Sequence, residues 1–169
     1  MSTDSTVADA PAAASPTALL ITPAQFLAHW QGHRKLTRRM IDAFPDDQLF
    51  SFSVGGMRPF GVLANEMLGM AVPTVQGVIT DAWVAYAEGA ATTKQEVLAQ
   101  WDDTTTQLES LFPQIPEARF QETMTAFGQW TMPGYDLLLY VVDNEIHHRG
   151  QGYTYLRALG IEPPPFWER

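Results

Sequence analysis

The sequence predicts an all-α fold, a four-helix bundle with one long crossing connection. Four segments repeat apolar residues at a spacing of three or four, which is the pattern of one helix face. Helix start and stop signals flank these segments, and no stretch alternates clearly enough to predict a strand ladder. With 169 residues, 46% of them hydrophobic, the chain is long enough for one domain with a substantial core.

The N-terminal residues differ from the rest of the chain. Residues 1–20 are rich in Ala, Ser, Thr and Pro and show no hydrophobic period. Such a segment cannot offset its ordering entropy by burial, so we expect a disordered tail before a single domain over residues 21–169. Asp4 and Asp9 stand where a secretory signal would carry positive charge, which favours a cytoplasmic protein.

The first two helices are marked by their flanking residues. Helix one is expected to begin after Thr22, which serves as its N-cap, and to end at Pro45. A turn-rich loop follows. The second helix is expected to start near Pro59, to break or bend at Pro73, and to continue towards Tyr86.

The third and fourth helices are separated by a proline-containing connector. Residues 93–112 open with a capping box and keep a helical apolar period. Residues 113–134 alternate too weakly for a strand and are expected to form an extended crossing loop. The last helix is expected from about residue 133 to 159, with Gly160 ending it.

Charge and composition exclude several functions. Ten Lys and Arg residues against nineteen Asp and Glu residues give a formal charge of −9, so the protein should repel nucleic acid and anionic membrane surfaces. The absence of cysteine excludes disulfides, a cysteine nucleophile and Cys-ligated metal sites. No segment approaches the roughly 18 uninterrupted apolar residues of a membrane span.

Polar residues interrupt the apolar face of the last helix. Asn144 and His148 are four residues apart and fall on a stripe that also carries Leu137 and Tyr155, so both should point into the bundle. His147 falls on a different, more polar stripe, because neighbouring residues of a helix diverge by about 100°. Buried Asn and His side chains need polar partners inside the core.

Glu66 on the second helix is a candidate partner. Its neighbours one turn away are apolar, where an unpaired carboxylate would be costly. A metal cation could satisfy it, and so could a salt bridge to Arg149 or Arg58. A lone core histidine such as His148 is more often hydrogen-bonded than metal-bound, so the spacing leaves both readings open.

The stretches "EIHHRGQ" and "YLRALGIEPPPFWE", together with "RPFGVLANEM" earlier in the chain, resemble the DinB/YfiT-like family of metal-dependent enzymes. The resemblance covers most of residues 21–169. It implies a four-helix bundle with a long crossing connection, often dimeric, whose core holds a divalent metal such as zinc or nickel.

The resemblance also implies which positions hold the metal. The usual ligands are one histidine from the second helix and a pair four residues apart on the fourth. Carried over, these positions are Glu66, Asn144 and His148, so this sequence keeps one of the three histidines. A His, Glu and Asn set is richer in oxygen and shifts the preference towards manganese, iron(II) or magnesium. Alternatively, the three side chains bond to one another and to water.

Several functions are compatible with this resemblance. The first is a metal-dependent thiol-transferase or hydrolase acting on a small molecule, with a low-molecular-weight thiol as a further partner and His147 or Tyr155 as acid/base or binding groups. Arg149 and Gln151 would then support the metal ligands or form an interface. The second is a non-catalytic bundle that binds a small ligand or a partner chain in the same cavity. The third is a structural homodimer, because residues 137–142 are apolar all round.

Overall fold

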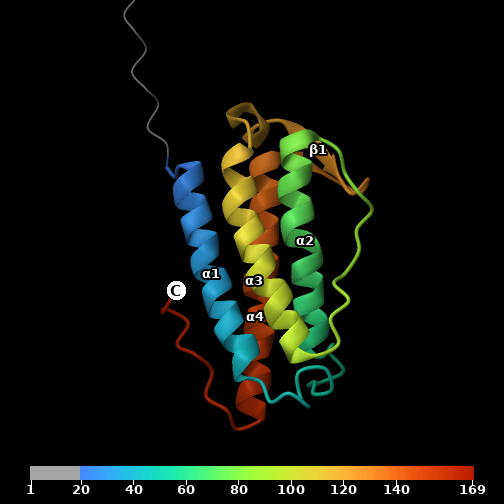
Figure 1. The fold of residues 1–169 in the computed structure, drawn as a ribbon, viewed down its shortest axis with the longest axis vertical. Coiled ribbons are helices and arrows are strands. Elements are labelled where there is room, and N and C mark those ends of the chain that lie inside the picture. The colour runs from blue at the N-terminus through green and yellow to red at the C-terminus, as the bar shows by residue number, and fades with distance from the viewer. Residues whose placement is uncertain (1–19) are drawn as a thin grey trace, which may run out of the picture.

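The computed structural model describes residues 20–169, which form a four-helix bundle. Its helices are α1 (Pro23–Ala43), α2 (Phe60–Thr80), α3 (Lys94–Leu111) and α4 (Gly134–Ala158), and they lie side by side along the long axis (Figure 1). The predicted fold class is confirmed. The tail predicted for residues 1–20 lies, apart from Leu20, outside the described residues.

Helices α1 and α3 begin as their sequences predict. The Thr22 side chain accepts a hydrogen bond from the Gln25 backbone N–H, and the Gln25 side chain accepts one from the Thr22 N–H. Thr93 and Glu96 form the same reciprocal pair at the start of α3. Each pair satisfies N–H groups that the first helical turn leaves without partners.

Helix α2 differs from its prediction at its end. It continues through Pro73 without a break, and it ends at Thr80. Asp81 stops it by adopting the left-handed conformation with a φ of 57°. The predicted continuation towards Tyr86 is therefore wrong. Burial of α2 in the bundle compensates for the hydrogen bond that proline removes.

Residues 82–92 form an extended strip that runs back along α2 (Figure 1). Two glycines of α2 allow this close approach. A Cβ atom at Gly69 would lie 2.3 Å from the carbonyl oxygen of Ala87, and one at Gly77 would lie 2.4 Å from the ring of Trp83. The strip covers one side of α2 and contributes to the pocket described below.

The connector between α3 and α4 is more regular than the predicted extended loop. It contains two short 3-10 helices, η1 (Phe112–Gln114) and η2 (Glu117–Phe120), and an antiparallel hairpin of β1 (Thr123–Ala126) and β2 (Trp130–Pro133). The hairpin turn places Phe127 and Gly128 at positive φ. Strands of four residues are too short to show a clear alternation, which is why the sequence did not predict them.

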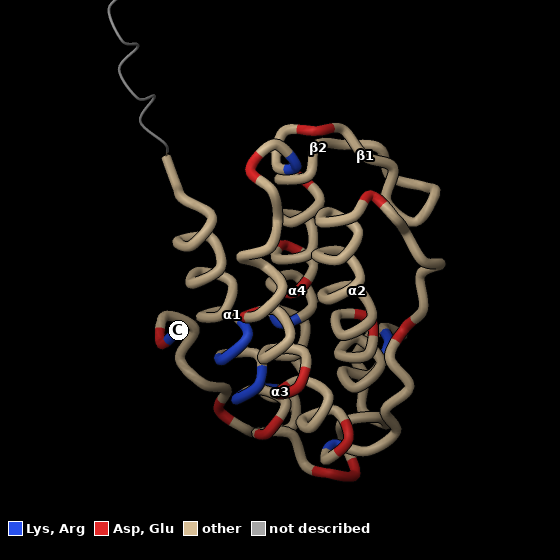
Figure 2. Tube along the Cα trace, turned by 45° about the horizontal axis from the view of Figure 1, so that its top comes forward, with Lys and Arg blue, Asp and Glu red and all other residues tan. Residues whose placement is uncertain are grey.

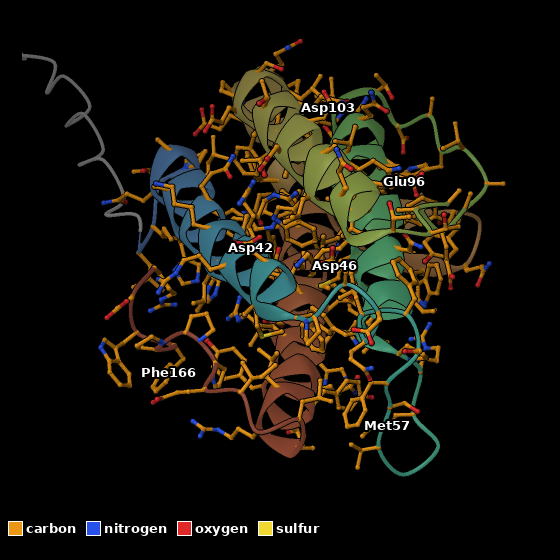
Figure 3. The ribbon with its side chains drawn as sticks, turned by 60° about the horizontal axis from the view of Figure 1, so that its bottom comes forward. Asp42, Asp46, Met57, Glu96, Asp103 and Phe166 are labelled. Carbon is orange, nitrogen blue, oxygen red and sulfur yellow. The ribbon has the colours of Figure 1, made fainter. Side chains whose placement is uncertain are left out.

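The apolar core divides into two clusters along the bundle axis. The cluster at the hairpin end includes Trp30, Val75, Leu108, Phe112 and Leu137. The cluster at the other end includes Phe44, Phe60, Trp101, Tyr155 and Leu156. Figure 3 looks along the bundle from this second end, with Phe166 in the C-terminal segment on the outside of the helices. Buried polar residues of α1 and α4 lie between the clusters in sequence, and they build the sites described next.

Helix α4 carries more apolar residues than one face can bury. Leu137 and Leu138 are buried, whereas Leu139 and Tyr140 are 42% and 48% exposed. The homodimer that the sequence suggests stays a prediction. Helix α2 is long and apolar enough to cross a membrane by length and composition, but 61% of the window concerned is buried within the bundle, as in the core helix of a globular fold.

Candidate functional site

Glu66, Asn144 and His148 meet between α2 and α4, as the sequence predicts. Asn144 Nδ2 donates a hydrogen bond to Glu66 Oε1 at 3.0 Å, and His148 Nε2 lies 2.9 Å from the same oxygen. The His148 side chain is buried, and that of Glu66 is 17% exposed. Two polar side chains of α4 therefore converge on one carboxylate oxygen of α2.

Gln151 fixes the orientation of His148. Its Oε1 lies 3.3 Å from His148 Nδ1, and its Nε2 lies 3.0 Å from His147 Nε2. With Gln151 in this orientation, His148 Nδ1–H donates to it, and Nε2 of a neutral ring presents a lone pair to Glu66. With the Gln151 amide turned over, Gln151 donates to Nδ1 and His148 Nε2–H donates to Glu66 directly; a metal ion between Nε2 and the carboxylate is the alternative.

Arg58 supplies a positive charge on the outer side of Glu66. Its Nη2 donates to Glu66 Oε2 at 2.5 Å, and its Nη1 lies 3.7 Å from Glu88. Burial opposes ionisation of Glu66, but the hydrogen bonds from Asn144, His148 and Arg58 outweigh it and lower the pKa to about 2. The Glu66 carboxylate is therefore ionised at neutral pH.

The depressed pKa of Glu66 predicts a stability loss in acid. Glu66 contributes stability above its ordinary pKa of 4.5, and this contribution disappears as the pH falls towards 2. Relative to Glu66→Gln, the wild type should lose about 2 kcal/mol between neutral pH and about pH 2, after allowance for partial exposure. Urea unfolding across this range measures the difference. Glu109→Gln, at an exposed position, serves as the control, and a constant gap between wild type and Glu66→Gln would contradict the prediction.

The three side chains fit a small divalent cation. Neighbouring ligand atoms around an octahedral ion with bonds of about 2.1 Å lie about 3 Å apart, close to the 2.9 Å between His148 Nε2 and Glu66 Oε1. Asn144 presents its Nδ2 to Glu66, so its amide would have to turn over to bring Oδ1 to an ion. Asn144 Oδ1 is buried and accepts no hydrogen bond from the protein, so it keeps a free lone pair. Among residues 20–169 no three His, Cys, Asp or Glu side chains could hold a metal, so the third ligand would have to be the Asn144 amide.

The two residues predicted as acid/base or binding groups lie elsewhere. His147 is exposed on the outside of α4, where Gln151 contacts it. Tyr155 is fully buried and donates its hydroxyl hydrogen to the Arg58 carbonyl at 3.0 Å, and burial raises its pKa. Neither residue lines the pocket beside Glu66. Their predicted chemical roles stay predictions, while the position of Tyr155 suits a role in holding the Arg58 segment.

A pocket of about 180 Å³ adjoins Glu66. Helices α2 and α4, the 82–92 strip and the hairpin all contribute to its walls. Most of the lining is apolar, and the residues in it that carry a carboxylate or a hydroxyl group are Glu66, Thr74, Tyr86, Glu88 and Tyr140. The strip and the hairpin are the two segments whose structure the sequence did not predict, so the pocket itself could not be anticipated.

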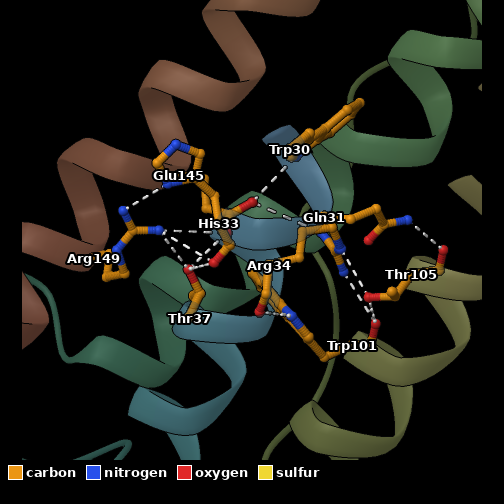
Figure 4. Close-up of polar contacts among 9 residues, drawn as sticks. All are labelled: Trp30, Gln31, His33, Arg34, Thr37, Trp101, Thr105, Glu145 and Arg149. Carbon is orange, nitrogen blue, oxygen red and sulfur yellow. Dashed lines mark hydrogen bonds and ion pairs between the residues drawn. The ribbon is translucent and has the colours of Figure 1, made fainter. Parts of the chain in front are cut away.

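A second buried polar network joins α1 to α4, and sequence reasoning missed its centre (Figure 4). Glu145 is 2% exposed and accepts hydrogen bonds from Thr37 at 2.6 Å and from the Trp30 ring at 3.3 Å. Arg34 and Arg149 lie 4.0 and 3.9 Å from its carboxylate. Burial raises the Glu145 pKa, against the opposing effects of these four groups. The sequence signal that could have revealed Glu145 is a second inward-facing stripe on α4, at residues 138, 142, 145, 149, 152 and 156.

Arg149 is part of this network and is not the salt-bridge partner of Glu66. Its Nη1 donates to the Thr37 hydroxyl at 3.1 Å, and its Nη2 lies 2.9 Å from His33 Nδ1. Desolvation of the His33 ring, together with the nearby Arg149 charge, lowers the His33 pKa to about 4. Of the two arginines considered as salt-bridge partners of Glu66, Arg58 takes that position.

Comparison with known proteins yields a family and two similar folds. The family model described as "DinB family" matches residues 14–169. No curated protein matches the chain. A DinB-like protein from Bacillus subtilis, YjoA, has a crystal structure with a TM-score of 0.68 and 18% identity, covering 86% of this chain and 98% of that one. A DinB-like protein from Bacillus cereus ATCC 10987 gives 0.68 and 20%, covering 84% and 95%. At these identities the two structures establish the fold alone.

Proposed function

The chain belongs to the DinB family, and from this membership and the geometry of Glu66, Asn144 and His148 we propose that it is a metal-dependent enzyme acting on a small molecule. The convergence of these side chains from two helices beside a pocket carries the proposal. A bound divalent cation would supply Lewis-acid polarisation of a substrate atom. The reaction would be transfer to a low-molecular-weight thiol, or hydrolysis.

The protein's own groups have separate parts in this proposal. His148 binds through Nε2 while Gln151 holds its other ring nitrogen, the usual support of a histidine ligand. Glu66 would supply the one negative charge of the ligand set, and Asn144 would supply its amide oxygen after the amide turns over. One nitrogen and two oxygen donors favour manganese, iron(II) or magnesium over zinc and nickel.

Arg58 favours a second candidate function, a metal-free protein that binds a small ligand in the same pocket. A guanidinium already neutralises Glu66, so a divalent cation would have to bind beside an existing positive charge. In this alternative His148 Nε2–H donates directly to Glu66, and the pocket binds its ligand without catalysing a reaction.

Elemental analysis of protein purified without a nickel column distinguishes the two candidates. His29 and His33 are four residues apart on α1 with their Nε2 atoms 3.1 Å apart, and such a pair can capture metal adventitiously. The analysis should therefore use a His29→Ala background, which leaves buried His33 in place. We expect near-stoichiometric metal after growth with manganese or iron, lost in His148→Ala and kept in His147→Ala. Absence of metal under every supplementation, with the fold intact, would support the metal-free alternative.

A further inference from the structure

We propose that the pocket takes a small molecule with an apolar body and a neutral hydrogen-bonding group at the end remote from Glu66. This inference deepens the proposed function, because it names the chemical class of substrate for the same site. It rests on the direction of the pocket, the placement of its charges, and two hydroxyl groups that have no partner in the protein.

The pocket is elongated along α2. Glu66, Met70 and Thr74 follow one another at intervals of four residues, so they lie on one face of the helix. Eight residues of helix span about 12 Å. Thr74 and the hairpin residue Phe127 therefore mark one end of the pocket, and Glu66 marks the end at which chemistry is proposed.

All charged side chains of the lining lie at the Glu66 end. The two carboxylates are Glu66 and Glu88, and Arg58 contacts both of them from outside the pocket. Figure 2 shows Lys and Arg residues concentrated on α1; they are Arg34, Lys35, Arg38 and Arg39. None of these four residues lines the pocket. A charged ligand group at the Thr74 end would lose its water without gaining a counter-ion, so that end selects a neutral group.

Thr74 carries the first unpartnered hydroxyl. Threonine hydroxyls in helices of this protein usually donate to the carbonyl four residues earlier, as those of Thr80, Thr105, Thr106 and Thr154 do. Thr74 is 2% exposed, and its Oγ1 has no hydrogen-bond partner in the protein. A buried hydroxyl without a partner is costly, and a ligand group in the pocket would satisfy it.

Tyr86 carries the second unpartnered hydroxyl, between Glu66 and the hairpin end of the pocket. Its hydroxyl is buried without a partner, and desolvation together with the charges of Glu66 and Glu88 raises its pKa to about 12. The hydroxyl therefore stays protonated at neutral pH and can donate a hydrogen bond to a ligand.

Aromatic rings form the wall opposite α2. Phe127 makes edge contacts with Tyr86 and Trp130, at centroid distances of 6.0 and 6.2 Å. The backbone of Phe127 has a φ of 53°, a conformation that a bulky residue rarely adopts. Strain of this kind gathers at ligand sites. The wall suits a flat apolar ligand, and the pocket volume of about 180 Å³ suits a ligand with a single ring.

Calorimetric titration with p-cresol and with 4-hydroxybenzoate tests the proposal on chelator-treated protein. The two probes share a phenol and differ in a methyl group against a carboxylate. We expect p-cresol to bind and 4-hydroxybenzoate not to bind. In one orientation the carboxylate of 4-hydroxybenzoate would lie beside the Glu66 carboxylate, and in the other it would lie at the Thr74 end, where the lining that the structure describes holds no cation to neutralise it. Equal binding of the two probes, or no binding of p-cresol, would overturn the inference.

Thr74→Val provides a matched variant. It keeps the shape of the side chain and removes the unpartnered hydroxyl, so we expect a higher melting temperature and about tenfold weaker binding of p-cresol. Binding of toluene, which has no hydroxyl, should not change. Unchanged p-cresol binding in Thr74→Val would contradict the assignment of Thr74.

The metal content of the same samples separates this inference from the proposed function. Binding of p-cresol by protein that takes up no manganese would remove the enzyme proposal and keep the ligand class. Uptake of manganese by protein that does not bind p-cresol would keep the enzyme proposal and remove the ligand class.

Discussion

Replacing Glu145 by alanine is expected to destabilise the protein by about 3 to 5 kcal/mol. The carboxylate sits between Arg34 and Arg149, and all three side chains are almost completely buried. Its removal leaves two guanidinium groups in the core without their counter-ion and deprives Thr37 of the closer of its two acceptors, the other being the His33 carbonyl oxygen. Urea unfolding at neutral pH measures the loss.

A matched control and a double-mutant cycle complete the test. Asp143→Ala changes an exposed carboxylate on the same helix and should alter stability by less than about 0.5 kcal/mol. Adding Arg149→Met to Glu145→Ala should cost less than the sum of the single changes, because the two side chains interact. A cost below about 1 kcal/mol for Glu145→Ala would show that the network contributes little to stability.

The second large effect is a gain of function. Asn144→His should raise the affinity for zinc by at least about tenfold, because a neutral imidazole binds this ion more strongly than an amide oxygen does. The new ring would stand four residues before His148 and face Glu66, where Asn144 now donates its hydrogen bond. Competition with a fluorescent zinc chelator, in the His29→Ala background, measures the change.

Asp143→His in a His147→Ala background is the control for this gain, because Asp143→His alone would place two exposed histidines four residues apart and create a new metal-capturing pair. It adds a histidine to the same turn of α4, on an exposed position beside the site. It should leave the zinc affinity of the Glu66 locus unchanged. If a folded Asn144→His variant gains no affinity, the three side chains do not form a metal-binding set.

Most of the bundle follows from local sequence signals. The start of α1 at Thr22 and of α3 at Thr93 could be predicted, because a capping residue and its partner lie within one helical turn. The course of residues 82–92 could not, because it depends on the close approach that Gly69 and Gly77 permit across space. Proline is a local signal as well, but burial of α2 overrides it at Pro73.

The candidate site could be predicted to a similar extent. Helical spacing placed Asn144 and His148 on one face, and the apolar neighbours of Glu66 marked it as their candidate partner before the family resemblance named all three. Glu145 escaped prediction because its partner Arg34 is distant in sequence, so no local pattern paired them. The unpartnered hydroxyls of Thr74 and Tyr86 were beyond prediction for a related reason, since the hairpin and the strip that enclose them were not foreseen.

Anomalous diffraction from crystals grown with manganese tests the metal proposal most directly. We expect one strong anomalous peak between α2 and α4, at a bonding distance of about 2.0 to 2.3 Å from His148 Nε2 and from a Glu66 carboxylate oxygen. No peak at this position, with His148 bonded directly to Glu66 in crystals of metal-saturated protein, would contradict it.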